Sequence, residues 1–359
     1  MENVGHVNLG SHDDGQGIKI VQLTDLHQWP SGVKTFKARG RVIDFDKEGY
    51  DTGRNVELVE HVLQRSKPDL VILTGDILDG RPCQDMERYT FRTVMMDVLK
   101  PIIEREIMWT FVPGNHDDDH SPWTREDLIE IYSLPFCVSA KAKTFNHTFT
   151  LGHTAEPCAD SSVRIWLFDS GANSDDPKLR YTTFSAESIE GYVRMSSDPS
   201  LGPSAVGLAY FHIPLPEYEG VVPCCGKNAL FDAGLAGGLV PFPFNYQPFT
   251  FLVRLLGRDL VAGCSRLNSG AFEAFSKQGN ILATFCGHDH HSDFVGKRGN
   301  IYLCYGRCGG FTPPSNWEGA GGDFAFDHGA RVVRVRSKED VSTWVCTFKR
   351  DVEDFFELK

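Results

Sequence analysis

The sequence predicts a layered α/β fold, and two features carry this prediction. Short apolar runs that are typical of buried strands recur along the chain. The stretch NVELVEHVLQRS (55–66), between the first two runs, has apolar residues at helical spacing. Strands that alternate with helices pack as layers around a shared core. The chain has 359 residues, of which 41% are hydrophobic, so it can bury a large core.

Six apolar runs are expected to form buried strands. In chain order they are IKIVQLT (18–24), KPDLVILTGD (67–76), MWTFV (108–112), RIWLFDS (164–170), GLAYFHIP (207–214) and ILATFC (281–286). Five of the six end in a cluster of Asp, His or Asn, and RIWLFDS ends more plainly. Ligand sites in open α/β sheets lie beyond the carboxyl ends of the strands. These polar clusters therefore predict a site at one edge of the sheet.

The chain is expected to form one domain over residues 18–350, preceded by a flexible leader over residues 1–17. The segments ARVVRVR (330–336) and STWVCTF (342–348) alternate and predict antiparallel strands that close the fold. Residues 221–263 are rich in Gly, Pro and Phe and are expected to form an insertion, which would lie over the site as a flap.

The charge and cysteine content exclude several classes of function. A net charge of −12 argues against binding of long nucleic acids, but it leaves small phosphorylated substrates open because metal ions reverse the local field. The chain contains no apolar run of about 18 residues, so the sequence predicts no membrane-spanning helix. The ten cysteines have no repeated C-x-x-C frame, which argues against a structural zinc ribbon. We expect a cytoplasmic protein; secretion or an organellar location requires a leader that has been removed.

The first two polar clusters contain Asp25, His27 and Asp76. Residues two apart in an extended segment project to one side, so Asp25 and His27 are suited to bind one ion. Asp76 follows a glycine that permits close backbone approach. Each cluster alone also has an ordinary explanation. An Asp-x-His pair often occurs by chance, and a lone Gly-Asp pair more often caps a turn.

Three further clusters follow later strands. Residues 115–117 are Asn, His and Asp, and four acidic or imidazole groups in a row (116–119) are costly unless solvent or a cation compensates. His212 alone reads as a core histidine. His288 and His290 alternate and point to one side of an extended loop. Five such clusters at predicted strand ends together indicate a metal site.

The order of these motifs resembles that of the calcineurin-like metallophosphoesterases. The motifs D-x-H, G-D, G-N-H-D, a lone His and G-H-x-H occur in that order within residues 18–348. FHIPLPEY, CGHDHHSDF and YGR look like the subgroup that contains the yeast Dcr2 phosphatase and plant purple-acid-phosphatase-like proteins. The resemblance implies a four-layer α/β/β/α sandwich of two mixed sheets flanked by helices, with a dinuclear metal site at the strand carboxyl ends.

The resemblance also implies a set of metal ligands. Two divalent or trivalent ions per chain are expected, chosen among Mn, Zn, Fe and Mg. Mixed imidazole, carboxylate and amide ligands suit Zn, Fe or Mn better than Ca. Asp76 is expected to bridge the two ions. The other expected ligands are Asp25, His27 and His290 for the first ion and Asn115, His212 and His288 for the second.

The expected catalytic residue is His116, as the general acid that protonates the leaving oxygen. Asp79, three residues after Asp76, is the expected partner of His116, by analogy with the serine/threonine phosphatases of the same superfamily. Asp117 is the alternative partner. Asp79 also has an ordinary explanation, as a turn residue in LDGRP.

The residues expected to contact the substrate phosphate are Asn115, His116, His291 and Arg307. Arg307 can act as a bidentate donor. An arginine that lies in solvent at the end of a strand is an equally good reading of that position.

The expected activity is hydrolysis of a phosphomonoester, on a small molecule or a phosphoprotein, by a metal-activated bridging hydroxide. A phosphodiesterase acting on cyclic nucleotides or other small diesters is the alternative, and an inactive scaffold is a weaker one because no ligand is missing. True purple acid phosphatases have a tyrosine in a G-D-x-x-Y motif. The chain has Asp79 there, so no tyrosinate–iron colour is expected.

Overall fold

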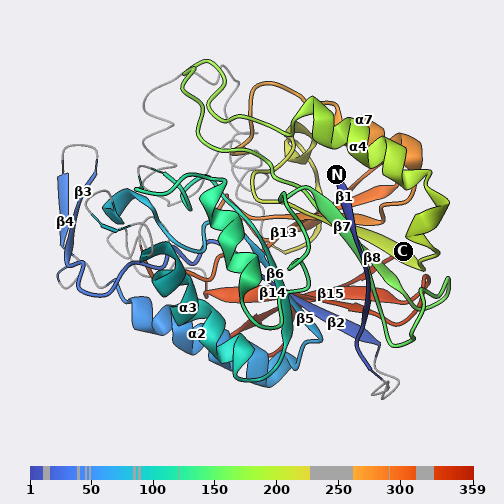
Figure 1. The fold of residues 1–359 in the computed structure, drawn as a ribbon, viewed down its shortest axis with the longest axis horizontal. Helices are drawn as coiled ribbons and strands as arrows, with labels where there is room; N and C mark the ends of the chain where they lie inside the picture. Colours follow the sequence, from blue (N-terminus) through green and yellow to red (C-terminus); the bar gives the residue numbers. More distant parts are fainter. Residues whose placement is uncertain are drawn as a thin grey trace, which may run out of the picture.

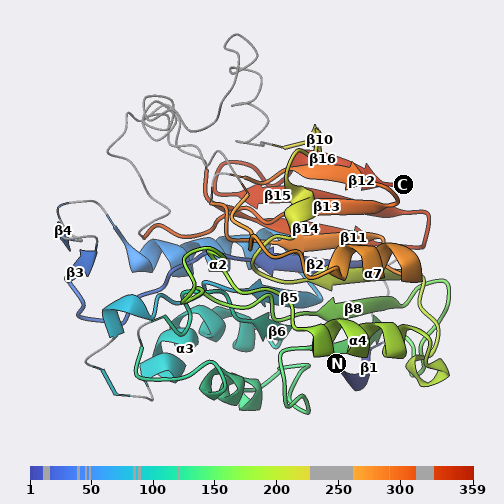
Figure 2. The same cartoon turned by 90° about the horizontal axis from the view of Figure 1, so that it is seen from above.

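The computed structural model of the chain has two mixed β-sheets between two pairs of helices (Figures 1 and 2). The residues that it describes are 1–10, 17–38, 41–44, 47, 50–83, 86–87, 90–119, 121–226, 262–290, 292–312 and 327–359. The order of layers is α/β/β/α, which confirms the fold class predicted from the sequence.

The first sheet has six strands in the order β16-β15-β14-β2-β5-β6. β2, β5 and β6 are parallel to one another, and β14, β15 and β16 are antiparallel to their neighbours. Both strands predicted near the end of the chain are thus confirmed. The bounds are β2 (Ile18–Leu23), β5 (Leu70–Thr74), β6 (Met108–Val112), β14 (Gly329–Val335), β15 (Val341–Thr347) and β16 (Glu353–Leu358).

The second sheet has eight strands in the order β1-β7-β8-β9-β11-β13-β12-β10. β8, β9, β11 and β13 are parallel, so their carboxyl ends meet at one edge. The bounds are β1 (Glu2–Asn8), β7 (His147–Gly152), β8 (Val163–Leu167), β9 (Val206–Tyr210), β10 (Pro223–Cys225), β11 (Ala283–Cys286), β12 (Val295–Arg298) and β13 (Ile301–Tyr305). A separate hairpin joins β3 (Thr35–Ala38) to β4 (Arg41–Asp44).

Four α-helices cover the outer faces of the sheets in the described part of the chain. They are α2 (Thr52–Ser66), α3 (Thr90–Ile103), α4 (Ala186–Ser196) and α7 (Ala271–Gln278). Short 3-10 helices are η1 (Arg81–Cys83), η2 (Asp127–Ser133), η3 (Pro199–Leu201) and η4 (Pro216–Tyr218). α2 begins where the Asp51 carboxylate accepts hydrogen bonds from two free backbone amides, and it ends where Lys67 adopts a left-handed conformation.

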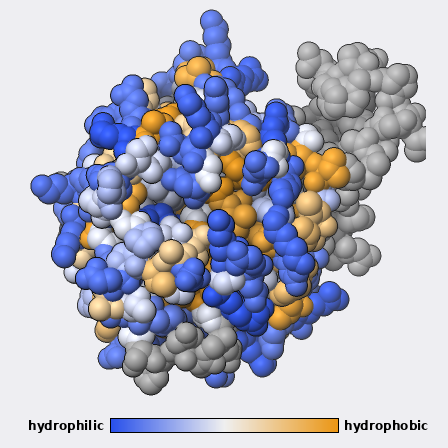
Figure 3. All heavy atoms as spheres, turned by 90° about the vertical axis from the view of Figure 1, so that its right-hand side faces the viewer, coloured by the Kyte–Doolittle hydropathy of each residue, from blue (hydrophilic) through white to orange (hydrophobic). Residues whose placement is uncertain are grey.

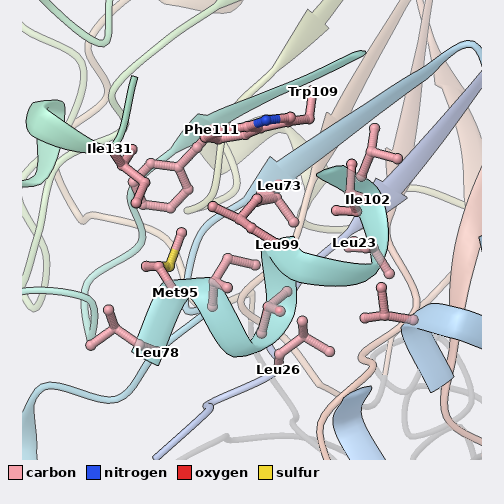
Figure 4. Packing of buried hydrophobic residues seen from close by; sticks show 14 of the residues in the cluster. Leu23, Leu26, Leu73, Leu78, Met95, Leu99, Ile102, Trp109, Phe111 and Ile131 are labelled. Atoms are coloured by element: carbon pink, nitrogen blue, oxygen red, sulfur yellow. The ribbon is translucent and has the colours of Figure 1, made fainter. Parts of the chain in front are cut away.

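Strand periodicity assigns the buried side chains to separate layers of the core. On β2, Val21 and Leu23 pack toward α2 and α3, whereas Ile18 and Ile20 pack between the sheets. Alternate residues of a strand face opposite sides, so one fully apolar strand supplies both layers. Figure 4 shows the first of these layers, with Met95, Leu99 and Ile102 projecting from α3. A third cluster lies between the second sheet and α4 and α7.

The outer surface is mainly hydrophilic where it is visible in Figure 3, with small apolar areas between polar side chains. None of the described helices is both long and apolar enough to cross a membrane.

The N-terminal leader expected over residues 1–17 needs correction. Residues 2–8 form β1, which pairs in parallel with β7. The sequence ENVGHVN is polar and contains glycine, but β1 is an edge strand, and its side chains are only half-buried or exposed. An edge strand does not need a continuous apolar run, which explains why the pattern was missed. Most of the insertion expected over 221–263 lies outside the described residues; within it, β10 pairs with β12.

Substitution of Leu99 by alanine tests the layer between α3 and the first sheet. Leu99 is fully buried, so Leu99→Ala is expected to lower the free energy of unfolding by about 2–5 kcal/mol. The neighbouring Lys100, whose side chain is 67% exposed, is the control. Lys100→Ala is expected to change the free energy of unfolding by less than about 0.5 kcal/mol. Urea denaturation measures both; equal effects would contradict the proposed packing.

Candidate metal centre

The predicted ligands lie at the carboxyl ends of five strands that belong to both sheets. Asp25 and His27 follow β2, and Asp76 follows β5. The remaining ligands are Asn115 after β6, His212 after β9, and His288 and His290 after β11. The structure therefore gathers residues from five segments that are distant in sequence at one end of the sandwich.

The first group of ligands comprises Asp25, His27, Asp76 and His290, whose ligand atoms all lie within 4.8 Å of one another. Nε2 of His290 is 3.2 Å from Oδ1 of Asp25 and 3.3 Å from Nε2 of His27. Nε2 of His27 is 3.7 Å from Oδ2 of Asp76. The atoms surround one point, as the ligands of a single ion do.

The second group comprises Asp76, His212 and His288, and it satisfies the same 4.8 Å limit. Nε2 of His212 is 3.2 Å from Oδ2 of Asp76 and 3.3 Å from Nδ1 of His288. Asp76 is the one residue common to both groups. It is thus placed as a bridging carboxylate must be.

Asn115 is held next to Asp76 by its two sequence neighbours. The backbone N–H of His116 donates to Oδ1 of Asp76 at 2.8 Å. Gly114 touches Asp76 so closely that an added Cβ would lie 2.2 Å from Oδ1. Glycine is therefore required at position 114.

Two kinds of observation indicate that these residues fit metal ions. Imidazole nitrogens face each other at 3.3 Å in the pairs His27–His290 and His212–His288. Oδ2 of Asp76 and Oδ1 of Asn115 are buried and have no hydrogen-bond partner of good geometry. A buried polar atom without a partner costs about 1–3 kcal/mol. Cations between these atoms would supply the missing partner, and the mixed donor set suits Zn, Mn or Fe.

Outer hydrogen bonds orient the ligands. Nδ1 of His212 is 2.8 Å from the carbonyl oxygen of Thr74, which can only accept, so Nδ1 carries the proton and leaves Nε2 for a metal. Thr24 Oγ1 donates to Oδ2 of Asp25 at 2.8 Å. The backbone N–H of His288 also donates to the Asp25 carboxylate and thereby joins the two sheets.

Burial and neighbouring charges shift the pKa values of the acidic ligands. Burial alone would raise the pKa of Asp76, but the His212 and His116 side chains hold that pKa well below its usual value. Burial likewise opposes ionisation of Asp25, whereas His290 lowers the pKa of Asp25 to about 2. Both carboxylates are therefore charged at neutral pH, as metal ligands must be.

The pKa values of the buried histidine ligands shift in opposite directions. Burial lowers the pKa of His27 and, together with His212, holds the pKa of His288 well below the usual value. Burial also opposes the charged form of His212, but Asp76 raises the pKa of His212 to about 9. His27 and His288 are thus neutral at pH 7, the form that binds metals.

The backbone at the site is unusual. Asp25, His27, Asp76 and His288 have φ values of 55°, 46°, 48° and 77°. Positive φ is disfavoured for residues with a side chain, and such residues cluster at functional sites. At Asp76 this conformation is supported by Asp117, whose carboxylate accepts from the backbone amides of Asp76, Ile77, Leu78 and Gly114.

The predicted partners of His116 need correction. Nδ1 of His116 is 3.0 Å from Oδ2 of Asp119, so the carboxylate beside this ring belongs to Asp119 and not to Asp79 or Asp117. Asp79 instead binds the Arg81 guanidinium and lies 3.5 Å from Nδ1 of His27. The Asp117 carboxylate is occupied by backbone amides. The run of charges at 116–119 was visible in the sequence, but which member faces His116 depends on the turn.

Arg307 also needs correction as a residue that contacts the substrate. Its side chain is fully buried, and it forms an ion pair with Asp293 in which Nε donates at 2.6 Å. Its Nη1 donates to the carbonyl oxygen of Asp327. The guanidinium is therefore enclosed by the protein and is not placed to contact a substrate. His291, the other residue expected to contact phosphate, lies outside the described residues.

Two supporting residues were not predicted from the sequence. The Arg125 guanidinium donates to the Asp169 carboxylate and to the carbonyl oxygens of Pro113 and Gly114, which fixes the loop that carries Asn115. Asp289, between His288 and His290, accepts hydrogen bonds from Tyr305 Oη and from a backbone amide. Asp289 stands within the histidine-rich motif, whereas no local pattern marks Arg125.

Comparison with known families gives one match. Residues 18–292 match the family model described as calcineurin-like phosphoesterase. The matched stretch is more than half of the chain and contains every predicted metal ligand.

Two relatives illustrate the range of similar proteins. Phosphatase DCR2 of Saccharomyces cerevisiae is 31% identical over 326 residues, covering 85% of this chain and 50% of the yeast protein. This chain thus spans half the length of that relative. An Arabidopsis thaliana protein named "Probable inactive purple acid phosphatase 28" is 27% identical over 372 residues, covering 94% of this chain and 79% of the relative.

Two solved structures share the fold. A dimetal phosphatase from Danio rerio has a TM-score of 0.54 and 13% identity, covering 95% of this chain and 99% of that chain. GAP50, the anchor in the inner membrane complex of Plasmodium, has a TM-score of 0.50 and 10% identity, covering 95% and 88%. At these identities the likeness concerns the fold alone.

Substitution of Asp76 by asparagine tests the bridging position. Asparagine keeps the size of the side chain but removes its charge, so Asp76→Asn is expected to reduce binding from two Mn²⁺ per chain to fewer than one. Equilibrium dialysis followed by elemental analysis measures this stoichiometry. The exposed Asp160 provides a matched control, and Asp160→Asn is expected to retain both ions. Retention of two tightly bound ions by Asp76→Asn would refute the bridging assignment.

Proposed function

This chain belongs to the calcineurin-like phosphoesterase family, and we propose that it is a phosphatase that hydrolyses phosphomonoesters with two metal ions. The observation that carries the proposal is the shared position of Asp76 between two groups of ligands, beside the His116–Asp119 pair. Phosphorylated small molecules or phosphoproteins are the proposed substrates.

The two groups of ligands would each hold one metal ion. Asp25, His27 and His290 would complete the first position, Asn115, His212 and His288 the second, and Asp76 would bridge them. Bound ions of this kind polarise phosphate oxygens and lower the pKa of bound water.

His116 is the proposed general acid. Its backbone N–H binds Asp76, so the residue is tied to the centre of the site, and its ring centroid lies 5.4 Å from that of His27. The side chain is 19% exposed, which gives a substrate access to it. Because Nδ1 faces the Asp119 carboxylate, Nε2 is the nitrogen available to donate a proton to the leaving oxygen.

All predicted ligands and the proposed acid are present, which supports an active enzyme rather than a scaffold. The ligands alone do not distinguish a phosphomonoester from a small phosphodiester, because the same metal centre would act on either.

Hydrolysis of para-nitrophenyl phosphate beside bis-para-nitrophenyl phosphate tests the proposed activity. The protein is stripped of metal and reloaded with Mn, Zn, Fe or Mg in turn. Faster turnover of the monoester, restored by at least one metal, is the expected result. Preference for the diester would replace the proposal with a phosphodiesterase. No turnover with any metal, despite two bound ions, would overturn the proposed activity.

Variants of the proposed acid and its partner test the proton donor. His116→Asn is expected to lower kcat by about 10²–10⁴-fold for an alkyl phosphate, whose leaving oxygen needs a proton. The loss is expected to be smaller for para-nitrophenyl phosphate, whose leaving group is stable as an anion. Asp119→Asn is expected to show the same dependence on leaving group to a smaller degree.

His153 is the matched control for this experiment, because it lies outside the described site and contacts the backbone of Gly10. His153→Asn is expected to leave kcat unchanged for both substrates. An equal loss for alkyl and para-nitrophenyl esters in His116→Asn would show that His116 does not act as the acid.

A further inference from the structure

The side chains of Asn115 and Asn173 form a reciprocal contact at the edge of the metal centre. Nδ2 of Asn173 donates to the backbone oxygen of Asn115 at 3.3 Å. Nδ2 of Asn115 donates to Oδ1 of Asn173, also at 3.3 Å. Asn173 belongs to the loop of residues 171–182, termed here the Asn173 loop, which leads from β8 toward α4 (Figure 1).

This contact determines which way the Asn115 amide points. The backbone oxygen of Asn115 can only accept a hydrogen bond, so it selects Nδ2 of Asn173 as its donor. Oδ1 of Asn173 then faces Asn115 as an acceptor and selects Nδ2 of Asn115. Oδ1 of Asn115 is left buried and without a hydrogen-bond partner, which is the state required of a metal ligand.

The Asn173 loop is itself held in place. The backbone N–H of Thr182 donates to the oxygen of Ala172 at 2.9 Å, and the Thr182 hydroxyl accepts from the Ala172 amide at 2.7 Å. Gly171 has a φ of 92°, and an added Cβ would lie 2.2 Å from Thr182 Oγ1. Its backbone oxygen accepts from Arg125, which also holds the loop of Asn115. One guanidinium therefore connects the two loops.

The same loop contacts a second ligand. The Tyr181 ring packs edge-on against the His288 ring, with centroids 4.6 Å apart and planes at 90°. A β-bridge joins Tyr181 to Asn173, so the two contacts are mechanically linked. The backbone oxygen of Tyr181 accepts from Ser265 Oγ at 2.7 Å, which holds the backbone of the loop at this residue. Both ligands that the loop touches belong to the second metal position.

We propose that Asn173 is a positioning residue that orients Asn115 as a ligand of the second metal ion. The loop thereby controls the affinity of the second position and leaves the first, built from Asp25, His27 and His290, unaffected. The inference rests on the proposed function only in requiring that the site binds two ions.

Two substitutions of Asn173 separate its polar contact from its bulk. Asn173→Leu keeps a similar volume but offers no acceptor to Asn115. This variant is expected to lower the affinity of the second position for Mn²⁺ by about tenfold or more. Asn173→Asp keeps an acceptor for Asn115 Nδ2 and loses only the donor to the Asn115 backbone oxygen, so it is expected to bind the second ion more tightly than Asn173→Leu does. Calorimetric titration of the metal-free protein with Mn²⁺ yields both affinities.

Electron paramagnetic resonance of the loaded protein provides an independent signature. The native chain and Asn173→Asp are expected to give the spectrum of a coupled Mn²⁺ pair. At Mn²⁺ concentrations that fill only the first position in the leucine variant, that variant is expected to give the spectrum of an isolated ion.

Asn268 offers a matched control, because it is also exposed and its amide donates to one side chain, Glu217. Asn268→Leu is expected to leave both Mn²⁺ affinities unchanged. Unchanged affinities in Asn173→Leu, or equal weakening of both positions, would overturn the positioning role while the native chain still binds two ions. Failure of the native chain to bind two ions would overturn the proposed metal centre and this inference together.

Discussion

A single buried carboxylate, that of Asp76, is the constraint on which the rest of the site depends. One oxygen accepts from the His116 amide, and the other is buried between the histidines of the two ligand groups. Such a charge is costly to bury unless cations compensate for it. The carboxylate of Asp117, which binds four backbone amides, and the absence of a side chain at Gly114 hold this geometry. The fold thus holds a buried negative charge that bound metal ions would neutralise.

The site lies where the two sheets are joined by polar contacts rather than by apolar packing alone. Gln22 Nε2 on β2 donates to the backbone oxygen of Cys286 on β11, and Thr74 on β5 accepts from His212 beyond β9. The Asp25 carboxylate accepts from the His288 amide across the same gap. Since ligands from both sheets must converge within a few ångströms, the relative position of the sheets sets the geometry of both metal positions.

The sequence predicts most of the fold and the residues that gather at the candidate site, because their signals are local. Apolar runs followed by Asp, His or Asn identify the strands and the groups at their ends. Residues whose role depends on a distant partner are harder to predict: Arg307 faces Asp293 inside the protein, and Arg125 reaches Asp169, 44 residues away. Asn173 lies in a loop that carries no motif. The edge strand β1 was missed because its half-exposed side chains leave no apolar pattern.

Anomalous diffraction from crystals grown with Mn²⁺ tests directly whether the Asp76 carboxylate bridges two metal ions. Two peaks about 3.5–4 Å apart are expected, with the Asp76 carboxylate between them. The oxygen of the Asn115 amide is expected to face the second peak, and His27 and His290 are expected to lie beside the first. A single peak, or two peaks that do not share Asp76, would contradict the assignment of Asp76 as the bridge on which the site is built.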